Sequence, residues 1–198
     1  MTKPYNVILA GIGGQGVVAL TRVFREASKS LGWSFQSSIF KGGAQRLGAV
    51  HSTLRIFREP TPDYRHYSPE IPTAGLDLMI GFEPREALRY QSFFSPGTVF
   101  VINVAKQGEL GGRSLVENGN LLNEPVKLLH GLGCTVASRD FTAHAKKLYD
   151  DPKMMNFELG LACCESLGIS RDLFIQTFVQ VIPNSKNKLS KNEDPNGR

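Results

Sequence analysis

Four glycines lie within six residues near the start of this 198-residue chain, in the segment Gly11-Ile-Gly-Gly-Gln-Gly16. A short β-rich run over residues 5–10 leads into this cluster. Apolar residues spaced by three and four follow over residues 17–31, which is the pattern of an amphipathic helix. Because glycines permit the tight turn that joins a buried strand to a helix, the segment predicts the beginning of an α/β domain.

The rest of the chain continues this alternation. Further strands are expected at 33–40, 49–57, 76–81, 98–103 and 134–137, and helices at 83–94, 126–132 and 141–181, the last with breaks near 151 and 168. Strands that alternate with helices predict a Rossmann-like α/β fold with a mostly parallel sheet flanked by helices. We expect a single domain over residues 1–182 and a disordered polar tail over residues 183–198.

The glycine cluster matches G-x-G-x-x-G, and the exposed N–H groups at the start of the following helix favour a phosphate or carboxylate. A nicotinamide cofactor would also need an acidic residue at the end of the second strand. Residues 34–41 contain no Asp or Glu, and only Lys41 could meet a 2′-phosphate there. Three interpretations stay open: an NAD(P) site, a loop that only packs helix on strand, and a loop that contacts an anionic ligand or a partner chain.

A second polar cluster, residues 41–48, follows the second expected strand. The carboxyl ends of parallel strands share one edge of an open sheet, so this cluster is expected beside the glycine loop. The residues predicted to face a ligand or partner are Gly11, Gly13, Gly14, Gln15, Gly16, Lys41, Gln45 and Arg46. A solvated turn is the plainer alternative for the second cluster.

Composition excludes several classes of protein. The formal net charge is +5, of which +2 falls in residues 183–198, and the +3 left for the folded body is too weak to argue for nucleic-acid binding. The three cysteines include no C-x-x-C pair, so they predict neither a disulfide framework nor a metal site. No apolar stretch is long enough to span a membrane. We therefore expect a cytoplasmic protein that binds no membrane.

Candidate catalytic residues are lacking. The four histidines and three cysteines show no nucleophile–base arrangement and no metal-ligand spacing, and the adjacent Cys163 and Cys164 lie on an apolar helical segment. We therefore expect no catalytic residue and no metal in this chain, and no complete enzyme formed by the chain alone.

Four segments together resemble one family, the small gamma-type subunits of the 2-oxoacid:ferredoxin oxidoreductases, and among them most the beta subunit of the indolepyruvate enzymes. The segments are Gly11-Ile-Gly-Gly-Gln-Gly-Val17, then Lys41-Gly-Gly-Ala-Gln-Arg-Leu-Gly48 with Ser52-Thr-Leu-Arg-Ile56, then Phe82-Glu-Pro-Arg-Glu-Ala-Leu-Arg-Tyr90, and Asn156-Phe-Glu-Leu-Gly160. The resemblance covers residues 4–182.

The resemblance implies a subunit of a complex that oxidatively decarboxylates an arylpyruvate-type 2-oxoacid with coenzyme A to an acyl-CoA and passes electrons to ferredoxin. It implies that thiamine diphosphate, Mg²⁺ and [4Fe-4S] clusters lie in large partner subunits, and that CoA and the 2-oxoacid meet at a shared site. Many members carry Glu-Val-His-Gly where this chain has Ile39-Phe40-Lys41-Gly42, so no histidine role carries over. A stand-alone NAD(P)-dependent oxidoreductase and a non-catalytic assembly module stay as alternatives.

Overall fold

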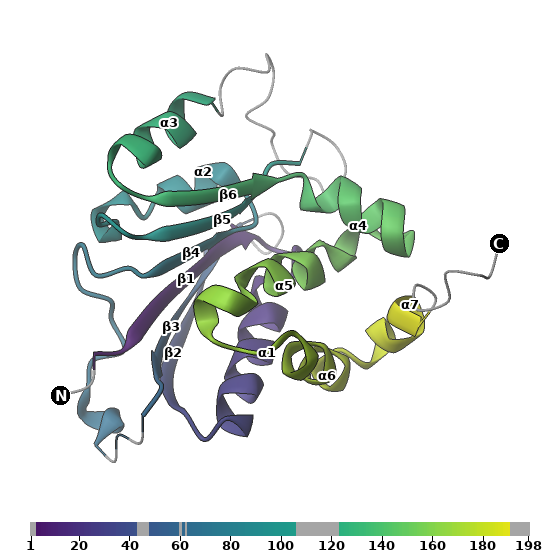
Figure 1. The fold of residues 1–198 in the computed structure, drawn as a ribbon, viewed down its shortest axis with the longest axis horizontal. Helices are drawn as coiled ribbons and strands as arrows, with labels where there is room; N and C mark the ends of the chain where they lie inside the picture. Colours follow the sequence, from purple (N-terminus) through teal and green to yellow (C-terminus); the bar gives the residue numbers. More distant parts are fainter. Residues whose placement is uncertain (1–2, 43–47, 60, 62, 106–122, 191–198) are drawn as a thin grey trace.

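The computed structural model describes residues 3–42, 48–59, 61, 63–105 and 123–190. Within these residues the chain forms a six-stranded sheet with the order β2-β3-β1-β4-β5-β6 (Figure 1). The strands are β1 (Tyr5–Ile12), β2 (Ser34–Lys41), β3 (Ala49–Phe57), β4 (Leu78–Gly81), β5 (Val99–Asn103) and β6 (Thr135–Arg139). The expected α/β class with flanking helices is confirmed.

The sheet is parallel except at one strand. β1 pairs in parallel with β4, β4 with β5, and β5 with β6. β3 is antiparallel to both of its neighbours, β1 and β2. The connection from β2 to β3 is too short for the crossover that a parallel pair needs, so the two strands form a hairpin and β3 is inserted between β1 and β2.

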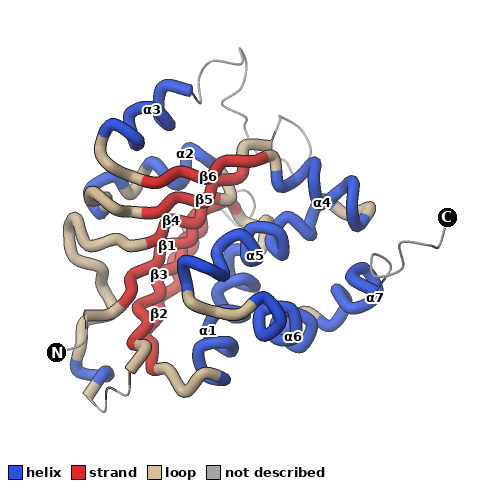
Figure 2. Tube along the Cα trace, viewed as in Figure 1, coloured by secondary structure: helices blue, strands red, loops and turns tan. Residues whose placement is uncertain are grey.

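Helices cover both faces of the sheet (Figures 1 and 2). α1 (Val17–Ser30), α5 (Met155–Leu167) and α6 (Arg171–Val181) lie on one face, and α4 (Phe141–Tyr149) lies beside α5. α2 (Pro84–Leu88) and α3 (Asn123–Gly131) lie on the other face. Side chains of β1 alternate between the faces: Val7 and Leu9 are buried on the α1 side, whereas Ile8 and Ala10 are buried on the α2 side.

The larger core joins α1, α5 and α6 through packed aromatic rings. The rings of Phe24 and Phe157 each lie 5.8 Å from that of Phe174. Gly160 on α5 makes this approach possible, because a Cβ there would lie 2.2 Å from Phe174 Cζ. The glycine at the end of the Asn156–Gly160 segment therefore sets the distance between α5 and α6.

The last described residues differ from the expectation of a disordered tail. A 3₁₀ turn (Pro183–Ser185) and α7 (Lys186–Leu189) follow α6. Ser185 is buried, Leu189 packs against the larger core, and Lys188 forms an ion pair with Asp151. Residues 183–190 return to the body because these contacts anchor them, and residues 191–198 of the expected tail lie outside the described part of the chain.

No helix among the described residues is long and apolar enough to cross a membrane.

Candidate functional site

The β1–α1 loop turns through two left-handed glycines. Gly14 and Gly16 both have a φ of 98°, a backbone conformation that other residues rarely adopt. Gly16 is also the residue before α1, and no side chain caps the helix. The loop geometry therefore favours glycine at both positions.

Two other glycines of the motif allow close approach or bonding of the backbone. A Cβ on Gly11, which lies inside β1, would meet Phe82 Cβ at 2.7 Å. The Gly13 N–H donates to the Gly48 carbonyl at 2.9 Å, which fastens the glycine loop to the residue that precedes β3. Gly11 therefore allows a close approach of Phe82, and it lies in the sheet and not in the loop.

Gln15 lies inside the molecule and links two sequence motifs. Its side chain is 5% exposed. Its Oε1 accepts from the Ile12 N–H at 2.8 Å, and its Nε2 donates to Glu83 Oε1 at 2.6 Å. Burial raises the pKa of Glu83, and the hydrogen bond from Gln15 opposes that rise. Both polar ends of Gln15 are occupied within the chain, so the residue braces the loop against the start of α2.

The second predicted cluster is described only at its two ends. Lys41 is exposed at the carboxyl end of β2, on the same edge of the sheet as the glycine loop. Because β3 lies between β1 and β2, Lys41 is two strand spacings, about 10 Å, from the end of β1. Gln45 and Arg46 lie outside the described residues, so their placement stays a prediction.

A pocket of about 250 Å³ opens beside the glycine loop. Its lining joins the loop to the turn before α5 and to the C-terminal turns. The lining residues are Gly14, Gln15, Gly16, Ala19, Asp151, Lys153, Met154, Asn156, Phe178, Ile182, Asn184, Ser185 and Lys188. Sequence reasoning missed Lys153, Asn156, Asn184 and Lys188, which are far from the glycine motif in the chain. The one sequence feature that pointed to any of these residues was the family segment Asn156–Gly160, which begins with Asn156.

The electrostatics of this pocket favour an anion. The first turn of α1 carries no acidic residue, and its free N–H groups and dipole place partial positive charge at Gly16. Lys153 and Lys188 add two ammonium groups, which only Asp151 among the lining residues opposes. Burial acts to raise the pKa of Asp151, but hydrogen bonds from Lys188 and from the Lys153 N–H lower it overall. Asp151 is therefore a carboxylate that holds Lys188 at the mouth of the pocket.

The Asn156–Gly160 segment contributes residues both to the pocket lining and to the buried interior. Asn156 crowds Gly16, since a Cβ on that glycine would lie 2.7 Å from Asn156 Nδ2. Glu158 is buried, accepts from Tyr149 Oη at 2.7 Å and lies 3.0 Å from His144 Nδ1. These bonds order the turn between α4 and α5, from which Lys153 reaches the pocket.

The cysteines form no ligand set. Cys163 and Cys164 are buried on α5, and burial raises the pKa of both thiols, that of Cys164 to about 11. Cys134 lies before β6, on the opposite face of the sheet. Among the described residues no group of three or more His, Cys, Asp or Glu side chains could hold a metal ion.

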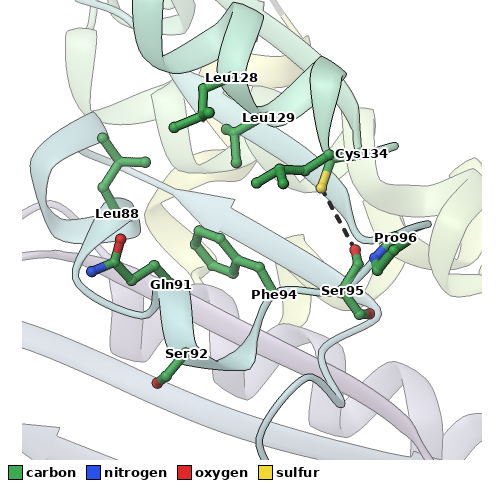
Figure 3. Close-up of a pocket in the computed structure, with 10 residues that line it drawn as sticks. Leu88, Gln91, Ser92, Phe94, Ser95, Pro96, Leu128, Leu129 and Cys134 are labelled. Carbon is green, nitrogen blue, oxygen red and sulfur yellow. Dashed lines mark hydrogen bonds between the residues drawn. The ribbon is translucent and has the colours of Figure 1, made fainter.

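A larger apolar groove of about 980 Å³ lies on the other face of the sheet, between α3 and the segment that follows α2 (Figure 3). Its lining is Leu88, Gln91, Ser92, Phe94, Ser95, Pro96, Leu128, Leu129, Leu132 and Cys134. Leu128 and Leu132 remain 65% and 51% exposed. This lining carries no charged side chain, so the groove suits an apolar contact and not an anionic ligand.

Comparison with known proteins identifies the family of this chain. Residues 6–194 match the family described as pyruvate ferredoxin/flavodoxin oxidoreductase. This chain belongs to that family. The match covers nearly all of the chain, so the family resemblance expected from the sequence is confirmed.

Curated relatives match this chain over part of their length. The indolepyruvate oxidoreductase subunit IorB of Archaeoglobus fulgidus is 36% identical over 101 residues, and that of Thermococcus kodakarensis is 31% identical over 101 residues. These matches cover 51% of this chain, and the chain spans about half the length (47%) of each relative.

Solved structures share the fold at low identity. The 2-oxoglutarate:ferredoxin oxidoreductase of Magnetococcus marinus, solved with 2-oxoglutarate, coenzyme A and succinyl-CoA, matches 98% of this chain with a TM-score of 0.70 and 16% identity. The match covers 30% of that longer chain. The gamma subunit of a keto/oxoacid ferredoxin oxidoreductase from Geobacter sulfurreducens matches with a TM-score of 0.60 and 16% identity, over 96% of each chain.

Proposed function

We propose that this chain is the gamma-type subunit of a 2-oxoacid:ferredoxin oxidoreductase that acts on an arylpyruvate-type 2-oxoacid such as indolepyruvate. In that reaction a 2-oxoacid and coenzyme A yield an acyl-CoA, carbon dioxide and a proton, and two electrons pass to two oxidised ferredoxins. The observation that carries the proposal is the pocket at the glycine loop, whose lining joins the glycine motif and Asn156 of a second family segment to lysines of the C-terminal part of the chain. The relatives named IorB support the choice of substrate class.

The chain's own part in the reaction is to bind and orient phosphate. The ammonium groups of Lys153 and Lys188 and the uncapped start of α1 converge on one pocket. Such a set fits the phosphates of coenzyme A, because charged donors and a helix N-terminus both bind phosphate oxygens. Gln45 and Arg46 are proposed to extend this surface, and no acid–base step is assigned to any residue of the chain.

The redox groups are proposed to lie in large partner subunits. Thiamine diphosphate with Mg²⁺ would supply the decarboxylation chemistry there, and [4Fe-4S] clusters would carry the electrons to ferredoxin. A cluster needs four cysteine ligands, whereas the three here are buried on two faces of the sheet. The exposed apolar groove with Leu128 and Leu132 suits contact with such a partner. Three free thiols fit a reducing compartment, and the cytoplasm is proposed.

The structure does not meet one geometric requirement of a nicotinamide site. A dinucleotide fold places the end of its second strand next to the glycine loop, so that an acidic side chain can reach the ribose. Here β3 separates β2 from β1, and β2 ends in Lys41. Binding of NAD(P)H to the purified chain would revive this alternative.

The test uses the complex reconstituted with its partner subunit and supplied with ferredoxin. We expect CoA-dependent reduction of ferredoxin with indolepyruvate as substrate. If the partner subunit alone gives the same turnover, the chain is instead a non-catalytic assembly module. Lys188→Ala should raise the KM for CoA about fivefold, because a partly exposed charged contact contributes about 1 kcal/mol. The KM for the 2-oxoacid should stay unchanged. Lys186→Ala, on the same turn but outside the pocket lining, is the matched control.

A further inference from the structure

The outer edge of the sheet at β2 has the properties of a pairing surface. β2 pairs with β3 over its whole length, from Ser34 opposite Phe57 to Lys41 opposite Val50, without a bulge. It contains no proline, and its single charge stands at its end, in Lys41. Protected edge strands usually carry prolines, bulges or central charges. Among the described residues no strand pairs with the other side of β2.

The backbone groups that face outward can be read from the hairpin. The Gly42 N–H donates to the Ala49 carbonyl at 2.8 Å, and the Ser38 carbonyl accepts from Ser52 Oγ at 3.0 Å, so both residues turn these groups toward β3. Hydrogen-bonded pairs alternate along an antiparallel ladder. The residues whose N–H and carbonyl groups point outward are therefore Phe35, Ser37, Ile39 and Lys41.

The side chains along this edge are unusually apolar for an exposed strand. Ile39 is 37% exposed and Phe40 is 49% exposed. Phe40 stacks on His51 on one side of the sheet, with ring centroids 4.5 Å apart. Phe35 lies on the other side, where the guanidinium of Arg25 is 5.2 Å from its ring. Both faces of the strand thus present apolar surface next to free backbone groups.

We propose that two copies of this chain pair through their β2 edges, antiparallel about a two-fold axis at Ser37, to form one continuous sheet. This inference goes beyond the proposed function and does not depend on it. In this register the outward groups of Phe35 meet those of Ile39 from the second copy, and Ser37 meets its own copy. All outward-facing residues between Phe35 and Ile39 thereby gain ladder hydrogen bonds.

The side chains are complementary in the same register. Phe35 stands beside Ile39 of the second copy, which forms two equivalent apolar pairs on the α1 side. Lys41 stands opposite Trp33, so the two cations do not face each other. Because this register pairs Phe35 with Ile39 twice and keeps the two Lys41 residues apart, it selects a second copy over an unrelated strand.

The oligomeric state is measured on the full chain by light scattering and sedimentation equilibrium. Every sample carries Leu132→Lys, which suppresses association through the apolar groove and leaves β2 untouched. We expect a dimer whose dissociation constant rises at least about tenfold in Ile39→Lys and in Ser37→Pro. Pro at position 37 removes an outward N–H only, so the β2–β3 ladder should survive. A monomer at all concentrations, or a dimer that both substitutions leave intact, overturns the proposal.

Cross-linking tests the register and does not need the proline variant to fold. In an antiparallel hydrogen-bonded pair the Cα atoms lie about 5.5 Å apart, within reach of a disulfide. Ser37→Cys should therefore give a covalent dimer on oxidation. Lys41→Cys is the control, because two such residues would be about 27 Å apart in the proposed register. Equal cross-linking of both variants, or none at position 37, would refute the pairing.

Discussion

Replacing Gln15 by leucine tests whether this residue of the glycine loop braces the fold or faces a ligand. The substitution keeps the approximate size of the side chain and removes both of its hydrogen bonds. It leaves the Ile12 N–H and the Glu83 carboxylate without the partners that now lie at 2.8 Å and 2.6 Å. Since Gln15 is 5% exposed, water has little access to replace it.

The expected loss follows from the two bonds. A bond between neutral groups contributes about 0.5–1.5 kcal/mol and one to a charged group about 1.5–3 kcal/mol, which predicts a loss of about 2–4 kcal/mol in the free energy of unfolding. For a chain of this length that corresponds to a decrease of about 5–15 °C in Tm. Thermal unfolding followed by circular dichroism measures it, and Gln176→Leu on the exposed side of α6 is the matched control.

The loss should also depend on pH. Burial already raises the pKa of Glu83, and removing the hydrogen bond from Gln15 raises it further. The ionised carboxylate is the form that the bond stabilises, so the difference between wild type and Gln15→Leu is largest at neutral pH. It should shrink as the pH falls through the raised pKa of Glu83 and the group becomes protonated in both proteins. A Tm equal to that of the control at neutral pH, together with weaker CoA binding, would show that Gln15 acts on a ligand.

Three further predictions concern stability and reactivity. Gly14→Ala should lower the free energy of unfolding by about 1–2 kcal/mol, because only the left-handed backbone at this position opposes a Cβ. Gly16→Ala should lower it more, because a Cβ there also meets Asn156. Chemical denaturation compares the two variants, and equal losses would contradict the contact with Asn156. Gly160→Ala should lower the free energy of unfolding by at least about 1–3 kcal/mol, because the new Cβ pushes Phe174 away. Glu165→Ala, on the exposed side of α5, is the control. An unchanged denaturation midpoint would show that α5 and α6 can separate freely. Cys163 and Cys164 should react with a thiol reagent at neutral pH only after unfolding in urea, because burial shields both sulfurs and raises their pKa; rapid labelling of the native protein would contradict this.

Local signals predicted most of the fold. The strand, glycine turn and helix over residues 5–31 follow from periodicity and from the backbone freedom of glycine, and the structure places β1 and α1 there. The order of strands did not follow, because the pattern of β3 does not show which neighbour it pairs with. The hairpin is decided by the short connection to β2 and by the pairing of both strands in space.

The candidate site was predicted only in part. The motif located the glycine loop, but it could not show that Gln15 turns inward to Glu83 or that Lys41 is held away from the loop by β3. Lys188 was assigned to a disordered tail because its neighbours are polar. Its ion pair with Asp151 is a long-range contact that no local pattern records.

The sequence by itself determined the α/β class, the position of the glycine turn and the family, since each depends on residues close together in the chain. The tertiary structure decided which lysines share the pocket with that turn, which glutamine is a brace, and which strand edge is left unpaired. Those properties depend on distances between segments that lie far apart in the chain, and only packing of the whole chain sets them.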